Sequence, residues 1–430
     1  MNLLFIHQNF PGQFLHAAVH FASLGHRVMA LREGPMKHAP LAGVEVLSYR
    51  PKQGNTPGIH GFAQEFESKT LRAEGCALLA QDLAESGFVP DVILAHPGWG
   101  EALYLKDVFP EARLVCLMEY FYRAKGQDLD FDPEFPALDL TAKARLHTKN
   151  ANLLLAMEAM DLGIAATHWQ ASTLPQWARA KTTVIHEGID TDEVAPHSAA
   201  ELRLPNKHLH VRHGDEVLTF VARNLEPVRG YHQFMRALPA IMKARPNLQV
   251  FIVGGEAQGY GSKGETLSWR EHYLSEVAHL LDPARVHFLG QVSRTVFLRL
   301  MQISRCHVYL TYPFVLSWSM LEAMSAGAIV VGSDTKPVQE VIEHGKNGLL
   351  VDFFNPQQIA STVCHVLANP NEYGHIRAQA RATIKARYDL KGVCLQAYEK
   401  ILTQPHCERE QDRLISLPVR EATITPLAFN

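Results

Sequence analysis

The sequence predicts an α/β fold made of two doubly wound domains in tandem, and three observations carry that prediction. Short apolar runs alternate with helical patterns from one end of the chain to the other. The runs are rich in Val, Ile and Leu without polar alternation, which is typical of strands buried on both faces of a parallel sheet. The scheme occurs twice, on either side of a polar stretch, Asp190–Asp215, that lacks periodicity and reads as a linker.

The first half contains seven apolar runs that predict strands, with helix-like segments between several of them. The segments Gln13–Leu24 and Phe62–Ser86 carry the clearest helical patterns. The predicted strands are Leu3–His7, Arg27–Leu31, Val44–Tyr49, Asp91–His96, Arg113–Met118, Leu162–Thr167 and Thr182–His186.

The second half repeats the alternation and ends in three successive helical stretches and a polar tail. Its predicted strands are Val217–Ala222, Leu248–Val253, Val286–Leu289, His307–Tyr312, Ala328–Gly332 and Gly348–Val351. Its predicted helices are Tyr231–Arg245, Leu267–Leu281, Thr295–Ile303, Ser319–Ser325, Val338–Glu343, Pro356–Ala368, Asn371–Arg387 and Leu390–Thr403. We place the domains at residues 1–195 and 210–388, with 389–430 as a terminal helix and tail.

Composition excludes several other classes of protein. The 430 residues carry a formal net charge of −3, so no basic excess favours nucleic acid as a partner, and any anion site is local. The six cysteines form no closely spaced pair, which argues against a zinc knuckle and fits a reducing compartment. The N-terminus lacks the features of a signal peptide, and no apolar stretch is long enough to span a bilayer.

Several motifs lie at the carboxyl ends of predicted strands, where doubly wound sheets bind ligands. The segment from Asn9 to Phe14 follows the first strand and opens a helix. Gly12 would let a ligand approach the backbone there, and Gln13 lies beside it. An ordinary tight turn explains the same residues. His96 and Glu119 also end strands and would point into a cleft, although a local salt bridge, for instance with Arg123, would equally account for Glu119.

Two arginines lie just past the end of the strand Val217–Ala222. Arg223 and Arg229 could bind a pyrophosphate, because a guanidinium group can donate two parallel hydrogen bonds to a phosphate and stays charged at any pH. Exposed loop arginines that pair with Glu226 are the alternative. Gly254, in a strand that runs into a Gly-Gly turn, and Gln291 with Val292, at another strand end, mark further places where backbone could meet a ligand.

The stretch from Tyr312 to Gly327 predicts a strand end, a short loop and a helix start. The N–H groups of Trp318, Ser319 and Met320 could face a phosphate or a sugar hydroxyl. Glu322 could accept two ribose hydroxyls. Alternatively, Ser319-x-x-Glu322 is a capping box in which both side chains only satisfy the helix start.

Taken together, these residues resemble the retaining glycosyltransferases of family four (glycosyl transferases group 1), whose GT-B fold has two facing Rossmann-like domains and a deep interdomain cleft. The resemblance covers most of the chain and is strongest between Val217 and Asp352. The motifs occur in the family's order: 184–190, Ala222-Arg223 with Arg229-Gly230, 253–255, 288–290, and 321–324 followed by 327–331.

The resemblance implies roles for these residues. Arg223 and Arg229 would bind the donor diphosphate, and Glu322 the donor ribose. Gly12 would face the diphosphate from the other domain. The backbone from Leu316 through Ser317 and Trp318 to Ser319 would contact sugar and phosphate, and Gln291 and Val292 would lie beside the base. The helix Leu390–Thr403 would cross back to the N-terminal domain, and the loops Arg50–Phe66 and Arg123–Leu140 would choose the acceptor.

Two departures from the family pattern matter for sugar recognition. The family has two glutamates with seven residues between them, but the first position holds Phe314, and Val315-Leu316-Ser317 replaces the usual Gly-Phe-Gly. The family's histidine after the fifth strand is Glu119 here. A glutamate there could still bond a donor hydroxyl or stabilise oxocarbenium-like charge, and His96 would lie on the acceptor side.

The sequence therefore predicts a glycosyltransferase that moves a sugar from a nucleotide-diphosphate sugar, of the UDP or GDP type, to an acceptor hydroxyl in glycan biosynthesis. We expect no metal or resident cofactor. We expect a sugar, lipid-linked or small-molecule acceptor and no nucleic acid partner. The expected location is cytoplasmic, with peripheral contact at the inner face of the membrane as an option. An epimerase or phosphorylase on the same fold, or a degenerate nucleotide-sugar binder, remains the alternative.

Overall fold

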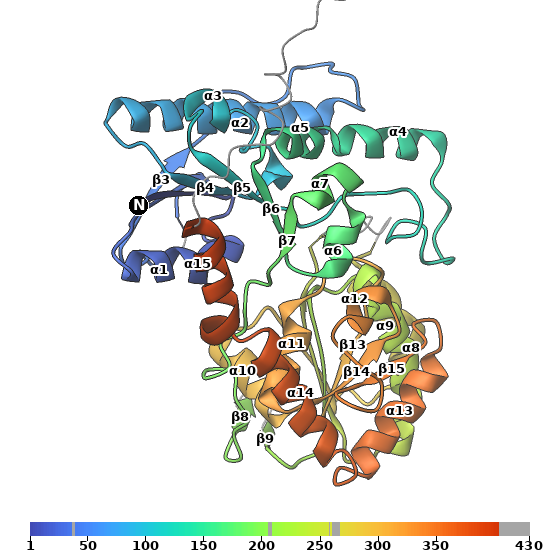
Figure 1. Ribbon diagram of the computed structural model, residues 1–430. Coiled ribbons are helices and arrows are strands. Elements are labelled where there is room, and N and C mark those ends of the chain that lie inside the picture. Colours follow the sequence, from blue (N-terminus) through green and yellow to red (C-terminus); the bar gives the residue numbers. More distant parts are fainter. Residues whose placement is uncertain (37–38, 205–208, 258, 260–266, 404–430) are drawn as a thin grey trace, which may run out of the picture.

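The fold consists of two parallel-sheet domains, drawn one above the other in Figure 1. The computed structural model describes residues 1–36, 39–204, 209–257, 259 and 267–403. The two sheets reproduce the predicted alternation of strands and helices, so the predicted α/β class with two Rossmann-like domains is confirmed. Among the described residues, no helix has the length and apolarity needed to cross a membrane.

The N-terminal domain is built on a sheet in the order β3-β2-β1-β4-β5-β6-β7, and every neighbouring pair is parallel. One face is covered by α2, α3 and α5, and the other by α1. Helix α4 lies against α2 and α5, and α6 and α7 follow β6. The elements are β1 (Asn2–Ile6), α1 (Leu15–Ser23), β2 (Arg27–Glu33), β3 (Val44–Tyr49), α2 (Gln64–Glu85), β4 (Val92–Ala95), α3 (Leu105–Val108), β5 (Arg113–Leu117), α4 (Leu140–Lys149), α5 (Ala151–Ala159), β6 (Leu162–Ala165), α6 (His168–Thr173), α7 (Gln176–Ala180) and β7 (Thr182–Val184).

The C-terminal domain has a sheet in the order β12-β11-β10-β13-β14-β15, again parallel throughout. Helices α8, α9 and α13 cover one face, and α10, α11 and α14 cover the other. The elements are β10 (Val217–Asn224), α8 (Tyr231–Ala244), β11 (Gln249–Gly255), α9 (Trp269–Val277), β12 (Val286–Gly290), α10 (Arg294–Ile303), β13 (Cys306–Tyr309), α11 (Trp318–Ala326), β14 (Ile329–Ser333), α12 (Lys336–Gln339), β15 (Leu349–Val351), α13 (Pro356–Ala368) and α14 (Gly374–Arg387).

The polar stretch between the domains is not the featureless linker that its lack of periodicity predicted. Strands β8 (Glu201–Leu204) and β9 (Leu209–Arg212) pair antiparallel within it. Buried Leu202 and Val211 add their side chains to the core under α10 and α11. A four-residue strand has too few positions for the alternation of apolar and polar residues to stand out in the sequence.

Helix α15 (Leu395–Thr403) lies beside α1 of the N-terminal domain (Figure 1). Its buried Leu395, Tyr398 and Leu402 share a core cluster with Phe14. The backbone carbonyl of Ile401 accepts a 2.6 Å hydrogen bond from Arg113 at the start of β5. The end of the described chain is thereby tied to the domain in which the chain begins.

A second connection runs from the N-terminal to the C-terminal domain through residues 120–138, which we call the interdomain strap. Its Phe131 ring packs 5.1 Å from that of Tyr312 and 5.2 Å from that of Phe353. Asp132 forms a buried 2.9 Å ion pair with His232 of α8. The strap overlaps the predicted acceptor loop 123–140, for which a solvated loop was one interpretation. Its docking on the other domain shows that this interpretation was wrong.

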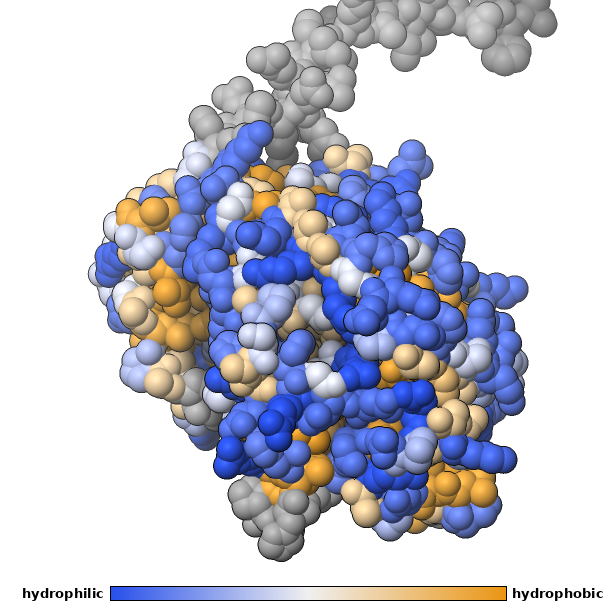
Figure 2. Space-filling view, turned by 90° about the horizontal axis from the view of Figure 1, so that it is seen from below, coloured by the Kyte–Doolittle hydropathy of each residue, from blue (hydrophilic) through white to orange (hydrophobic). Residues whose placement is uncertain are grey.

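The face at the far end of the C-terminal domain carries mostly hydrophilic side chains, with apolar ones scattered among them (Figure 2). The large apolar side chains of that domain that are most exposed among the described residues are Leu267, Leu280 and Phe354. Isolated apolar side chains of this kind are normal on a protein surface.

Candidate active site in the interdomain cleft

The larger of two connected hollows lies between the domains at the carboxyl ends of the strands. It has a volume of about 700 Å³. The N-terminal domain contributes residues that follow β1, β4 and β5, and the C-terminal domain contributes Arg223, Asn224 and Gln291. Of the predicted site residues, this cavity gathers six: Gly12, Gln13, His96, Glu119, Arg223 and Gln291.

The smaller hollow, of about 450 Å³, belongs to the C-terminal domain and shares Arg223 and Gln291 with the first. Its remaining predicted residues are Gly254, Val292, Ser317, Trp318, Ser319 and Glu322. Two predicted residues, Arg229 and Leu316, line neither hollow. Ser317, next to Leu316, does line the smaller hollow, so the fold brings twelve of the fourteen predicted site residues to the two adjoining hollows.

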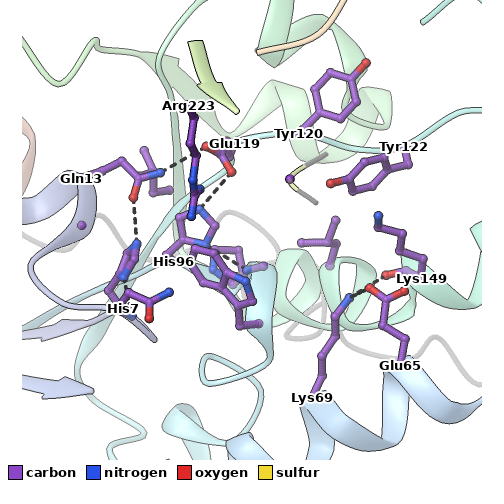
Figure 3. Close-up of a pocket in the computed structure, with 18 of the residues that line it drawn as sticks. His7, Gln13, Glu65, Lys69, His96, Glu119, Tyr120, Tyr122, Lys149 and Arg223 are labelled. Carbon is purple, nitrogen blue, oxygen red and sulfur yellow. Dashed lines mark hydrogen bonds and ion pairs between the residues drawn. The ribbon is translucent and has the colours of Figure 1, made fainter. Parts of the chain in front are cut away.

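Glu119 lines the larger cavity and has a partner on each of its carboxylate oxygens (Figure 3). Its Oε1 accepts a hydrogen bond of 3.2 Å from the amide of Gln13, and its Oε2 lies 3.5 Å from Nε2 of His96. Arg123, the partner weighed for it from the sequence, instead donates to the backbone carbonyl of Thr173. The local salt bridge with Arg123 was therefore a wrong alternative.

The electrostatic surroundings of Glu119 favour its ionised form. Burial raises its pKa, but His96, His7 and Arg229 together hold that pKa below the usual range for a glutamate. Burial, with His96 as the next cause, lowers the pKa of His7 to about 3. Since a group with so low a pKa is uncharged at neutral pH, the site pairs a charged carboxylate with a neutral His7.

Arg229 lies behind the cavity wall and is buried. Its Nη1 donates to Oγ1 of Thr311 at 3.0 Å and to the backbone carbonyl of Val315 at 2.8 Å. Its guanidinium therefore supports the loop that leads into α11, where Ser317 and Ser319 face the smaller hollow. Arg223, in contrast, is exposed and lines both hollows.

The start of α11 differs from the predicted capping box. Ser317 is the N-cap, and its side chain accepts from the backbone N–H of Ser319. Glu322 is buried in the second turn, where its carboxylate forms an ion pair with Arg294 of α10. Arg294 also reaches Glu193 of the interdomain segment at 2.9 Å. The carboxylate of Glu322 thus faces the cavity side of the helix and takes no part in capping it.

Burial raises the pKa of Glu322, and the ion pair with Arg294 acts in the opposite direction. A buried carboxylate is costly unless it is paired, so Arg294 compensates part of that cost. Because Arg294 also lines the smaller hollow, the pair belongs to the site itself.

Phe314, which stands where the resemblance places a glutamate, is buried. Its ring packs at 4.8 Å against Tyr120 of the N-terminal domain, and the guanidinium of Arg229 lies 5.6 Å above it. The Tyr120 hydroxyl donates to the backbone carbonyl of Pro313 at 2.9 Å. An interdomain aromatic contact therefore occupies the position of the missing carboxylate.

Sequence reasoning missed several residues of the cleft. His7 was assigned only to the first strand, although it lies two residues before the Asn9–Phe14 motif. Lys69 is on α2 and Lys149 on α4, far from any recognised motif, yet both line the larger cavity. The buried ammonium of Lys69 has acceptors in Glu65, Asn152 and the carbonyl of Lys149.

One group of potential metal ligands exists among the residues that the structure describes. Atoms of Asp132, Glu134 and His232 lie within 4.8 Å of one another. His232 is paired with Asp132, while Glu134 takes a two-pronged ion pair from Arg236. These contacts fasten the strap to α8, and a cation there would have to displace Arg236.

Comparison with known families matches both halves of the chain. A profile of the glycosyl transferase family 4 group matches residues 24–194, and a profile of the glycosyl transferases group 1 matches residues 206–383.

Among curated proteins, the chain is 27% identical over 231 residues to spore coat protein SA of Bacillus subtilis (strain 168), covering 52% of this chain and 60% of that protein. It is 26% identical over 215 residues to a GDP-mannose-dependent α-(1-6)-phosphatidylinositol monomannoside mannosyltransferase of Mycobacterium tuberculosis, covering 47% of this chain and 50% of that protein. The matched segments thus span little more than half of these relatives.

Solved structures share the fold at low sequence identity. The sucrose-phosphate synthase of Thermosynechococcus elongatus superposes with a TM-score of 0.68 at 17% identity, over 97% of this chain and all of that one. Anabaena HepE, solved in complex with UDP and glucose, gives a TM-score of 0.64 at 18% identity, over 94% of this chain and all of that one. Both are GT-B structures, so the predicted arrangement of two facing domains is confirmed.

Proposed function

Because the chain belongs to the family-four, group 1 glycosyltransferases, we propose that it moves a sugar from a nucleotide-diphosphate sugar to an acceptor hydroxyl with retention at the anomeric carbon. The observation that carries this proposal is the shared edge of the two hollows. Arg223 and the start of α11 lie on one side of it, and Glu119 and Gly12 lie on the other. A diphosphate at this edge would have the sugar it carries next to Glu119.

The departing diphosphate develops negative charge as its bond to the sugar breaks. Arg223 and the N-terminus of α11 with Ser317 and Ser319 supply positive potential at that place, and such fixed groups stabilise a transition state electrostatically. Glu322, in the smaller hollow, is suited to accept ribose hydroxyls, with Gln291 and Val292 at the base. We propose that these groups act without a resident cofactor.

The donor class has support from the printed names of relatives. Anabaena HepE is described in complex with UDP-glucose, and the mycobacterial relative as GDP-mannose-dependent. We therefore propose a UDP- or GDP-linked hexose as donor. The part of the cavity beyond His96, which Glu65, Tyr122 and Lys149 line, is polar and aromatic and suits a hydroxyl-rich acceptor, free or lipid-linked.

The alternatives are a phosphorylase or epimerase on the same fold and a binder without activity. A phosphorylase of this kind would use a lysine that forms a Schiff base. Lys69 is the buried lysine of the cavity, but its three bonds engage its ammonium as a support for the wall. A binder without activity would hold the nucleotide and give no transfer or donor hydrolysis.

The test is a thermal-shift screen of UDP, GDP, ADP and dTDP with their sugars, followed by donor hydrolysis with radiolabelled sugar. We expect one nucleotide class to stabilise the protein by about 2.7 kcal/mol at 100 times its Kd. Arg223→Ala should weaken that binding by roughly 10–100-fold, because a charged hydrogen bond contributes about 1.5–3 kcal/mol.

The matched control is Arg203→Ala in the β8–β9 hairpin, where the arginine pairs with Glu201 away from both hollows. If no nucleotide stabilises the wild type, or Arg223→Ala binds as the control does, the proposal is wrong. Binding without any turnover would favour the inactive binder.

A further inference from the structure

Two buried histidines from different strands converge on Glu119 in a way that the family resemblance does not explain. His7 follows β1 and His96 follows β4, and both rings are almost fully buried. His96 faces the carboxylate directly, and His7 reaches it through Gln13 (Figure 3).

The backbone determines which nitrogen of each ring carries the proton. Nδ1 of His7 accepts the N–H of Asn9 at 2.9 Å, and Nδ1 of His96 accepts the N–H of Gly98 at 3.1 Å. A ring nitrogen that accepts a hydrogen bond bears no proton, so a neutral ring carries its proton on Nε2. Both histidines are thereby set as donors at Nε2.

The two Nε2 donors are connected to the carboxylate of Glu119 in different ways, one through Gln13 and one directly. Nε2 of His7 donates to Oε1 of Gln13 at 2.8 Å, which turns the amide nitrogen of Gln13 towards Oε1 of Glu119. Nε2 of His96 is buried and lacks a hydrogen bond within normal length among the described residues, and Oε2 of Glu119 lies 3.5 Å away. A small movement of either side chain would complete that bond.

The surroundings of the two rings are built to hold them. A Cβ on Gly12 would come within 2.4 Å of the His7 ring, and one on Gly98 within 2.7 Å of the His96 ring. The indole of Trp99 stacks on His96 at 4.4 Å and meets His7 edge-on at 4.8 Å. The glycine that the sequence assigned to ligand approach therefore admits an imidazole.

We propose that His7 and His96 are positioning residues that keep Glu119 oriented and ionised, so that Glu119 serves as a fixed negative charge beside the reacting sugar and not as an acid or base. This inference rests on the proposed function. As the C1–O bond to the diphosphate breaks, its electron pair leaves with the diphosphate, and C1 becomes electron-poor next to Glu119. The acceptor oxygen then bonds to C1, and its proton passes to the departing diphosphate.

This arrangement makes a distinct prediction for pH dependence. The groups that face Glu119 are His96, His7 and Arg229, and they favour its charged form. Removal of either imidazole donor should raise the pKa of Glu119, so the acid limb of the kcat profile should move to higher pH. A variant that only disturbed the packing of the cavity lining would lower activity without moving that acid limb.

The experiment compares His7→Phe, His96→Phe and the conservative His7→Gln with His147→Phe, an exposed histidine on α4 that lines neither hollow. We expect His7→Phe and His96→Phe to lower kcat by about 10–100-fold, in line with the cost of misplacing a catalytic group. The Kd of the nucleoside diphosphate should change by less than about twofold. His7→Gln keeps a donor near the position of Nε2 and should recover part of the loss.

A second measurement separates this inference from the proposed function. The pKa of Glu119 can be followed by carbon-13 NMR of labelled glutamate carboxyls, assigned with Glu119→Gln. If the wild type binds no nucleotide, the proposed function fails. The titration still tests whether His7 and His96 lower the pKa of Glu119. An unchanged Glu119 pKa and an unmoved acid limb in both phenylalanine variants would overturn the inference, as would full activity of Glu119→Gln.

Discussion

Single side chains decide how the nucleotide half of the cleft is charged. Glu322 is the clearest case. Its burial and the nearby carboxylate of Glu193 both raise its pKa, whereas the ion pair with Arg294 lowers it. Sequence spacing offered two roles for Glu322, in ribose binding or in helix capping. The structure removes the capping role and adds a partner from another helix.

We predict that Arg294→Gln weakens nucleotide binding and makes it depend on pH. Without Arg294 the pKa of Glu322 should rise further, so more of the carboxyl is protonated near neutral pH and affinity should recover as the pH increases. Calorimetric titration of the bound nucleotide between pH 6 and pH 9 measures this. Arg299→Gln on the same helix, whose arginine contacts Gln302, is the control. Equal pH profiles for the two variants would contradict the prediction.

At the scale of elements, the interdomain strap joins the two halves of the cleft. Asp132 lies between His232 at 2.9 Å and the hydroxyl of Tyr312 at 2.5 Å. His232 and Tyr312 hold the pKa of Asp132 below its usual range although burial opposes them. A carboxyl whose pKa is lowered by folding stabilises the protein above its unfolded pKa and loses that contribution as the pH falls through the folded value.

Asp132→Asn should therefore destabilise the protein at neutral pH by about 3–5 kcal/mol, the cost of leaving one member of a buried pair alone. Below the ordinary carboxyl pKa the wild type loses the same contribution, so the difference between the two proteins should shrink. Denaturant unfolding at pH 7 and under acid conditions measures it. Asp130→Asn, in the same strap but bonded only to nearby backbone N–H groups, is the control. A difference that does not change with pH would contradict this account.

For the whole molecule, the strap and helix α15 set how the domains face each other. The strap reaches from the N-terminal domain to α8, and α15 returns from α14 to α1. Together, the strap and helix α15 restrict the separation of the two domains more than either contact would alone. A closed cleft also excludes water from a reactive donor.

We predict that solution X-ray scattering of the protein without nucleotide already matches the domain arrangement of the structure, and that saturating nucleotide changes the radius of gyration little. The double variant Phe131→Ala with Asp132→Asn should expand without ligand and contract with it, because it lacks the strap's aromatic and ionic contacts. A wild type that contracts strongly on adding nucleotide would show that the strap does not fix the arrangement of the two domains.

The sequence by itself determined the fold class and most of the cleft. Strands can be predicted from short apolar runs because burial on both faces is visible in the local sequence. The carboxyl ends of parallel strands share one edge of the sheet. Arg223, Gln291 and Glu119 could therefore be placed in the cleft from the sequence alone. The hairpin β8–β9 escaped prediction because its strands are too short to show a period.

Only the tertiary structure decided the partners of each charged group. The sequence could not show that Glu322 meets Arg294, that Asp132 meets His232, or that Glu119 meets His96, because each pair joins distant segments. Side-chain pairing depends on distances of a few ångströms after packing, and a one-dimensional pattern carries no such distances. The sequence therefore determined which residues line the cleft. The packing of the two domains decided which side chains pair, and these pairs set the ionisation and orientation of the charged groups.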